Sequence, residues 1–369
     1  MDINIKRFVD IDIQYHVPSS ISSIRDTAVL MTSEGTTGQN KVFNSLAVLT
    51  ADTTYGKLAE TVKYATIFFN NGGIKLDIHC GISDATGIVN EIKNLPNSEI
   101  VIAYVGSFDV LKEVATTMTS NEGTTGNIDA VYGINQKIIL ARATSEEVKD
   151  CSGINNFVVK VSDIEGAEMT IAAYLTKISI YGTDSIHDYA FTVESFTEEQ
   201  LASIINDDEL LGNVLDNNMN VDMELAGAIR NLGGNLTNGN DLVNQYVLIV
   251  LHQTVTDRLL NLLTQKLKGN AGVSAIYTTI AGELSRYVTN GYLTTDKVWT
   301  DTTKTIDYNN RTYTLIEEGT PLTLGYHITV LPLSSLTDED KAKRKCPPIY
   351  IFLADSYGIR SITVNGEVI

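Results

Sequence analysis

Residues 241–269, DLVNQYVLIVLHQTVTDRLLNLLTQKLKG, carry the strongest helical pattern in the chain. Asn240 or Asp241 can cap the start, and two lysines followed by Gly269 are typical of a helix end. The pattern predicts one helix with a broad apolar face, ~40 Å long at 1.5 Å per residue. The apolar positions are Leu242, Tyr246, Ile249, Val250, Val255, Leu259, Leu260, Leu263 and Leu267.

A second helix is predicted over residues 274–290, ending at Gly291. The connection between the two helices is short, so we expect them to pack as an antiparallel pair. His252 lies within the first helix, where a single histidine is more often a core or surface residue than a metal ligand.

Upstream of this pair, residues 27–140 have an α/β pattern. Buried strands are predicted at 28–31, 74–79 and 100–105, with a further apolar segment at 45–49. Helices are predicted at 53–70 and 82–92. This alternation indicates a mixed or parallel sheet covered by helices.

The middle of the chain is predicted to hold a helix at 169–178 and a strand at 189–193. Thr197 and Gln200 then have the spacing of a capping box at the start of a further helix.

The C-terminal part is rich in predicted strands. A hairpin at 308–316 turns at Asn309-Asn310, and a strand follows at 325–333. A short charged helix begins at Thr337, and strands follow at 349–353 and 359–364.

The N-terminus alternates strictly between apolar and polar residues, which is typical of a half-buried strand. Its apolar face is Val9, Ile11, Ile13 and Tyr15. Both ends of the chain therefore contain strand-forming segments. An unpaired terminal strand exposes backbone donors and acceptors that another chain can pair with.

The composition limits the class of protein. Of 369 residues 43% are apolar, and 27 basic against 45 acidic residues give a net charge of −18. Such a charge disfavours broad contact with nucleic acid or an anionic membrane. No apolar stretch approaches the ~20 residues of a membrane span, and the N-terminus does not have the pattern of a signal peptide. Three dispersed cysteines fit a chain made in a reducing compartment.

Motifs for catalysis are missing from the sequence: it has no HExxH, Walker-type loop, GxSxG or dinucleotide fingerprint. We therefore predict no catalytic residue, no cofactor and no metal. Cys80 follows His79, but zinc would need two more ligands. Acidic clusters at 207–209 and 338–340 are expected to begin helices, and the similar Gly-Thr segments at 31–38 and 118–126 are expected to be loops.

The order of elements resembles a contractile tail sheath protein of myovirus-type bacteriophages. The C-terminal pattern that carries the resemblance comprises Gly325-Tyr326-His327-Ile328-Thr329-Val330, Pro332, Arg344, Pro347, Ile349, Ile351, Gly358-Ile359 and Ile362-Thr363-Val364-Asn365-Gly366. The helix pair from Asp241 to Gly291 and the segment from Tyr64-Ala65 to Phe68-Phe69-Asn70-Asn71-Gly72-Gly73 are also similar to the family. Ser356-Tyr357 departs from its usual small-residue pair, and the chain is short for a sheath.

The resemblance implies an α/β and α+β fold in four parts. These are an N-terminal strand arm (1–24), an α/β domain (25–190), a C-terminal sheath domain with the helix pair (191–358) and a C-terminal strand arm (359–369). In such sheaths the arms pair with strands of neighbouring subunits. The arm residues here would be Val9, Ile11, Ile13, Tyr15, Ile359, Ile362, Val364 and Val368.

The implied function is structural. Subunits would stack as hexameric rings around a tail tube and contract to drive it through the host envelope, with baseplate and tail terminator proteins as further partners. No nucleic acid would be bound directly, no membrane would be entered, and the virion tail would assemble in the host bacterial cytoplasm.

Two alternatives stay open at this point. One is the sheath of an R-type bacteriocin or an extracellular contractile injection system. The other, from a different class, is a cytosolic α/β enzyme whose site the sequence does not reveal.

Overall fold

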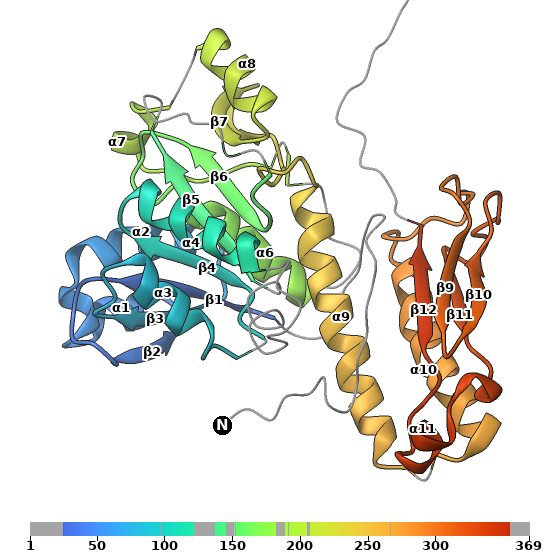
Figure 1. Cartoon of the computed structure of the whole chain (residues 1–369). Coiled ribbons are helices and arrows are strands. Elements are labelled where there is room, and N and C mark those ends of the chain that lie inside the picture. Colours follow the sequence, from blue (N-terminus) through green and yellow to red (C-terminus); the bar gives the residue numbers. More distant parts are fainter. Residues whose placement is uncertain are drawn as a thin grey trace, which may run out of the picture. The chain divides into compact units, whose positions relative to one another are not determined.

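The computed structural model describes residues 25–96, 98–121, 137–144, 151, 153–181, 189–190, 192–204, 207–265 and 267–354 (Figure 1). These residues form two compact units. The N-terminal unit runs to Ile249, and the C-terminal unit begins at Val250. The sequence-based boundary near residue 190 differs from this division, because strands well beyond that residue extend the sheet of the N-terminal unit.

An eight-stranded sheet forms the centre of the N-terminal unit, in the order β2-β3-β1-β4-β5-β6-β7-β8. Neighbouring strands from β3 to β7 are parallel, whereas β2 and β8 join the two edges antiparallel. The strands are β1 (Thr27–Thr32), β2 (Asn40–Phe43), β3 (Lys75–Cys80), β4 (Val101–Val105), β5 (Ile138–Ala143), β6 (Phe157–Val161), β7 (Asn220–Leu225) and β8 (Ala228–Leu232).

Helices cover both faces of this sheet (Figure 1). Side chains of α3 (Ala85–Ile92), α4 (Phe108–Asn121) and α8 (Asp208–Asp216) share one apolar core with Val29, Met31 and Ile102. The other face packs against α2 (Ala59–Asn70) and α6 (Met169–Tyr181). Since parallel strands are buried on both faces, they appear in sequence as continuous apolar runs such as Ala28-Val29-Leu30-Met31. Shorter helical segments are α1 (Leu46–Ala51), η2 (Tyr55–Lys57) and α7 (Glu198–Leu201).

The C-terminal unit contains the later part of α9 (Leu242–Leu263), followed by α10 (Gly269–Thr289). Arg258 Nε lies 2.9 Å from Glu283 Oε1, an ion pair that links the two helices. Two antiparallel strand pairs follow, β9 (Lys304–Tyr308) with β10 (Arg311–Ile316) and β11 (Tyr326–Val330) with β12 (Ile349–Leu353). Between β11 and β12 lie η5 (Leu333–Ser335) and α11 (Asp338–Ala342).

Several local predictions are confirmed. The hairpin turns at Asn309 and Asn310, whose φ values of 49° and 61° are those of a type I′ turn. Capping boxes begin α7 at Thr197 and α11 at Thr337, and the side chain of Asp207 caps α8. Both acidic clusters therefore begin helices as expected.

Other local predictions are wrong. Gly269 begins α10 and does not end α9, which stops at Leu263. The helix predicted from residue 53 begins at Ala59, because Asp52 accepts hydrogen bonds from the N–H groups of Thr54 and Tyr55 and holds a turn there. The apolar segment at 45–49, for which no element type was predicted, lies in a helix capped by Ser45.

The predicted strand at 189–193 and one predicted loop also differ from the structure. Val193 forms an isolated bridge with Arg230, and the N–H of Glu194 donates to the carbonyl of Ile229 on β8. Residues 118–121 end α4, whereas they were expected in a loop.

Candidate functional site

The two strands β11 and β12 form a two-stranded antiparallel sheet in the C-terminal unit. The N–H of Leu331 donates to the carbonyl of Pro348, and the N–H of Ala354 donates to the carbonyl of Gly325, which fixes the register. In an antiparallel ladder the hydrogen-bonded positions alternate. The backbone groups of Tyr350 and Phe352 therefore point toward β11, while those of Ile349, Ile351 and Leu353 point to the opposite edge.

Both faces of this strand pair are packed. On one face, the rings of Phe352 and Trp299 meet edge to face at 5.2 Å within an apolar core that also contains Leu315, Ile316 and Leu322. On the other, the hydroxyl of Tyr326 donates to the carbonyl of Ala281 on α10 at 3.3 Å. Packing on both faces holds the pair rigidly, so the outer edge of β12 is a preformed template for another strand.

Among the described residues, no third strand pairs with the outer edge of β12. The chain continues from this strand into the predicted C-terminal arm. The arm residues Val9, Ile11, Ile13, Tyr15, Ile359, Ile362, Val364 and Val368 lie outside the described residues, so their pairing stays a prediction.

A second polar site is buried in the N-terminal unit around Lys160 on β6. Its Nζ lies 2.5 Å from Glu194 Oε2, 2.8 Å from Asp222 Oδ1 and 2.6 Å from Thr170 Oγ1. The Tyr189 hydroxyl donates to Glu194 Oε1 at 2.5 Å. Burial raises the pKa of Asp222 well above its ordinary value, and the charge of Glu194 adds to this effect. Asp222 therefore favours its neutral form beside the Lys160–Glu194 ion pair.

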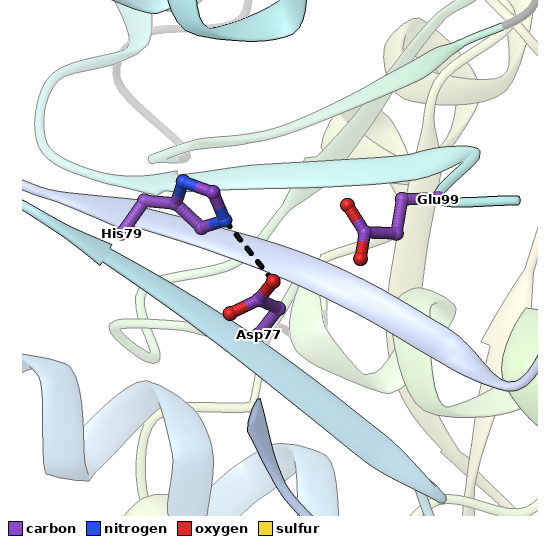
Figure 2. A group of neighbouring side chains, drawn as sticks. All are labelled: Asp77, His79 and Glu99. Atoms are coloured by element: carbon purple, nitrogen blue, oxygen red, sulfur yellow. Dashed lines mark ion pairs between the residues drawn. The ribbon is translucent and has the colours of Figure 1, made fainter. Parts of the chain in front are cut away.

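A third cluster joins Asp77 and His79 on β3 with Glu99, which precedes β4 (Figure 2). One ligand-type atom from each lies within 4.8 Å of the others, and all three residues are buried. His79 Nε2 is 3.2 Å from Asp77 Oδ2, and His79 Nδ1 is 2.7 Å from Glu91 Oε1. Burial lowers the pKa of His79, but the carboxylates of Asp77 and Glu91 outweigh this effect and raise the pKa overall.

Sequence reasoning missed both buried clusters. Asp77 and His79 are two residues apart on a strand and so share a face, which the sequence does show. Glu99 belongs to another segment, and β1 separates β3 from β4 in the sheet. The members of the Lys160 network likewise come from segments far apart in the chain.

No helix of the described part of the chain combines the length and the apolar character that crossing a membrane requires.

The comparisons with known proteins support the sheath resemblance. Residues 241–368 match the family described as "E217 tail sheath protein gp31-like, C-terminal domain". The match begins at the start of α9 and includes both strand pairs of the C-terminal unit. No curated protein sequence matches the chain.

Solved structures extend this likeness over the whole chain. The helical sheath of the anti-feeding prophage in its contracted state is similar with a TM-score of 0.59 at 12% identity, over 98% of each chain. The sheath complex of the extracellular contractile injection system PVC, also contracted, has a TM-score of 0.61 at 13% identity, over 97% of this chain and 96% of that chain.

At such low identity these structures show a shared fold. Residues 241–368 thus match the tail sheath family, and the chain shares the fold of these contractile sheath structures.

Proposed function

We propose that the chain is the subunit of a phage contractile tail sheath, polymerising as stacked hexameric rings around a tail tube. The observation that carries this proposal is the edge of β12, a packed strand whose outward N–H and carbonyl groups meet no third strand among the described residues. Main-chain pairing at such an edge provides affinity that does not depend on the surrounding side chains.

The terminal arms supply the pairing strands in this proposal. Residues 3–16 and 359–369 would leave their own subunit and extend the β11–β12 sheet of neighbours. A ladder of backbone hydrogen bonds can act as a hinge, because it persists while side-chain contacts between subunits change. The rings would then stay joined while the subunits rotate outward and the sheath shortens, driving the tube through the host envelope.

The particle and its partners also belong to the proposal. A phage tail assembled in the bacterial cytoplasm fits the tail sheath family that residues 241–368 match. The sheath of a bacteriocin or injection system is the alternative, favoured by the two similar injection-type sheaths. A tube, a baseplate and a tail terminator would be the partners, and the net charge of −18 would make their contacts sensitive to salt.

Negative-stain electron microscopy of the purified chain over a salt and concentration series tests the proposal. We expect tubes or stacked rings, and folded monomers after deletion of residues 1–16. If the truncated chain still formed tubes, the arm hypothesis would fail.

A matched pair of variants refines this test within the first arm. Ile11→Asp with Ile13→Asp changes the apolar face of the arm, and Asp10→Asn with Asp12→Asn changes its polar face. We expect only the first pair to prevent assembly, since strand pairing buries one face. Equal effects of the two pairs would argue against an amphipathic pairing strand.

A further inference from the structure

The Asp77–His79–Glu99 cluster leaves polar atoms unsatisfied in the interior. Asp77 Oδ1, His79 Nε2 and Glu99 Oε2 have no hydrogen-bond partner among the described residues. The exposed fractions of these residues are only 7%, 5% and 8%. Buried polar groups are nearly always hydrogen-bonded, so unsatisfied atoms on three neighbouring side chains indicate a missing partner.

The imidazole of His79 is oriented as a metal ligand is. Its Nδ1 lies 2.7 Å from Glu91 Oε1 on α3, which favours the tautomer with the proton on Nδ1. Nε2 then faces Asp77 and Glu99 with its lone pair (Figure 2). A histidine that binds zinc commonly donates its other ring N–H to a carboxylate in this way.

The distances also fit. Two ligand atoms of a tetrahedral zinc ion, each bonded at about 2.0–2.1 Å, lie roughly 3.3 Å apart. His79 Nε2 and Asp77 Oδ2 are already 3.2 Å apart. All three ligand atoms lie within 4.8 Å of one another, so a small movement of the flexible Glu99 side chain completes the set.

The charge of the cluster favours a cation as well. Asp77 and Glu99 place two carboxyl groups in this buried cluster, and a buried anion is unfavourable without a partner. The buried Lys137 offsets part of this charge, and its Nζ donates to the carbonyl oxygens of Pro96 and Glu99 at 2.6 Å.

The sulfur of Cys80 is not part of the set. Cys80 follows His79 on β3, so its side chain lies on the opposite face of the sheet. It faces the backbone of Gly35, where an added Cβ would be 3.0 Å from its Sγ.

We propose that Asp77, His79 and Glu99 bind a divalent transition-metal ion of the zinc type, with Glu91 as the positioning residue for His79. The ion links β3 to the segment before β4, across the intervening strand β1. It therefore holds three neighbouring segments of the sheet together. The three residues fill three of the four tetrahedral positions and leave the fourth to water, and with every ligand buried the role of the ion is structural. This inference stands independently of the proposed sheath function.

The test is zinc binding to the full-length chain after treatment with a chelator. We expect one Zn²⁺ per chain by mass spectrometry of metal content and by calorimetric titration. X-ray absorption at the zinc edge should show nitrogen and oxygen ligands only. A sulfur-containing shell, or no binding by the folded wild-type chain, overturns the proposal.

Variants assign the site. His79→Gln and Glu99→Gln should abolish binding of the single Zn²⁺ ion. Glu91→Gln should weaken binding ~10- to 100-fold, as loss of a hydrogen-bond partner of a metal ligand does. His327→Gln, which changes a half-buried histidine of the C-terminal unit, is the control and should bind as wild type. Binding that survives in a folded His79→Gln chain overturns the assignment. If that variant does not fold, the wild-type titration and its ligand shell decide alone.

Discussion

Lys160 Nζ and Glu194 Oε2 lie 2.5 Å apart in the interior of the N-terminal unit, where neither side chain reaches solvent to any extent. Lys160 comes from the inner strand β6, and Glu194 from the segment between α6 and α7. This pair therefore anchors an otherwise irregular stretch of chain to the sheet, together with the hydrogen bond from Tyr189 to Glu194.

Replacing Lys160 with methionine should strongly destabilise the N-terminal unit. The change leaves Glu194 buried without its cation, and breaking a buried pair from one side costs about 3–5 kcal/mol. Urea unfolding followed by circular dichroism measures the loss. The control is Lys41→Met, which removes an exposed lysine paired with Asp52 and should change stability little. Equal losses in the two variants would contradict a special role for Lys160.

Glu168 should make stability fall as the pH rises. Burial raises its pKa from 4.5 to about 7. Between these values the unfolded chain releases the proton while the folded chain keeps it, so the free energy of unfolding decreases with rising pH. From pH 5 to pH 8 the loss attributable to this group is about 2–3 kcal/mol.

Glu168→Gln isolates this contribution, because glutamine cannot titrate. We expect the variant to lose less stability than wild type between pH 5 and pH 8 in urea unfolding. Parallel pH profiles of the two proteins would show that Glu168 titrates normally in the fold.

Gly325→Ala should destabilise the C-terminal unit. Gly325 has φ +76°, and an added Cβ would lie 2.7 Å from Val288 Cγ2 on α10. Gly319→Ala is a matched control, since Gly319 has φ +83° but open space around its Cβ position. Backbone strain alone costs about 1–2 kcal/mol, and the contact with Val288 adds to it only at Gly325. The fluorescence of Trp299, the single tryptophan, measures the unfolding of this unit in urea. Equal losses would show that Val288 moves aside.

Ile349→Pro should block assembly without unfolding the subunit. The N–H of Ile349 points away from β11, and an edge strand tolerates proline at such a position. Tyr350→Pro is the counterpart, because its N–H points toward β11, and it should lose the native fluorescence of Trp299. Sedimentation and electron microscopy, under conditions where wild type assembles, measure the outcome. Tubes formed by Ile349→Pro would show that neighbouring strands do not pair at this edge.

Patterns that depend on a few neighbouring residues predicted the local structure well. The Asn309-Asn310 turn, the Thr197 capping box and the helix start at Thr337 follow from short-range geometry. The predicted end of the long helix was less accurate. Gly269 was predicted to end this helix, whereas it begins α10, with Lys268 at the N-cap position.

The sites could not be predicted in the same way. Glu99 reaches Asp77 and His79 across β1, which lies between β3 and β4, and Glu194 reaches Lys160 because its segment folds back onto the sheet. Contacts between such distant residues depend on the order of the strands in the sheet. The periodicity of apolar residues along the chain does not determine that order. The predicted terminal strands depend further on a neighbouring subunit.

The interior position of β1 also has a consequence during synthesis on the ribosome. The chain is made from its N-terminus, so β1 emerges well before β3 and β4, the two strands that flank it. At about 5–20 residues per second, the segment from β1 to β4 takes roughly 4–14 s to appear. Until β3 is made, four consecutive apolar residues, Ala28 to Met31, have neither flanking strand to pair with. We therefore expect the yield of native subunit to depend on chaperones that shield the nascent N-terminus.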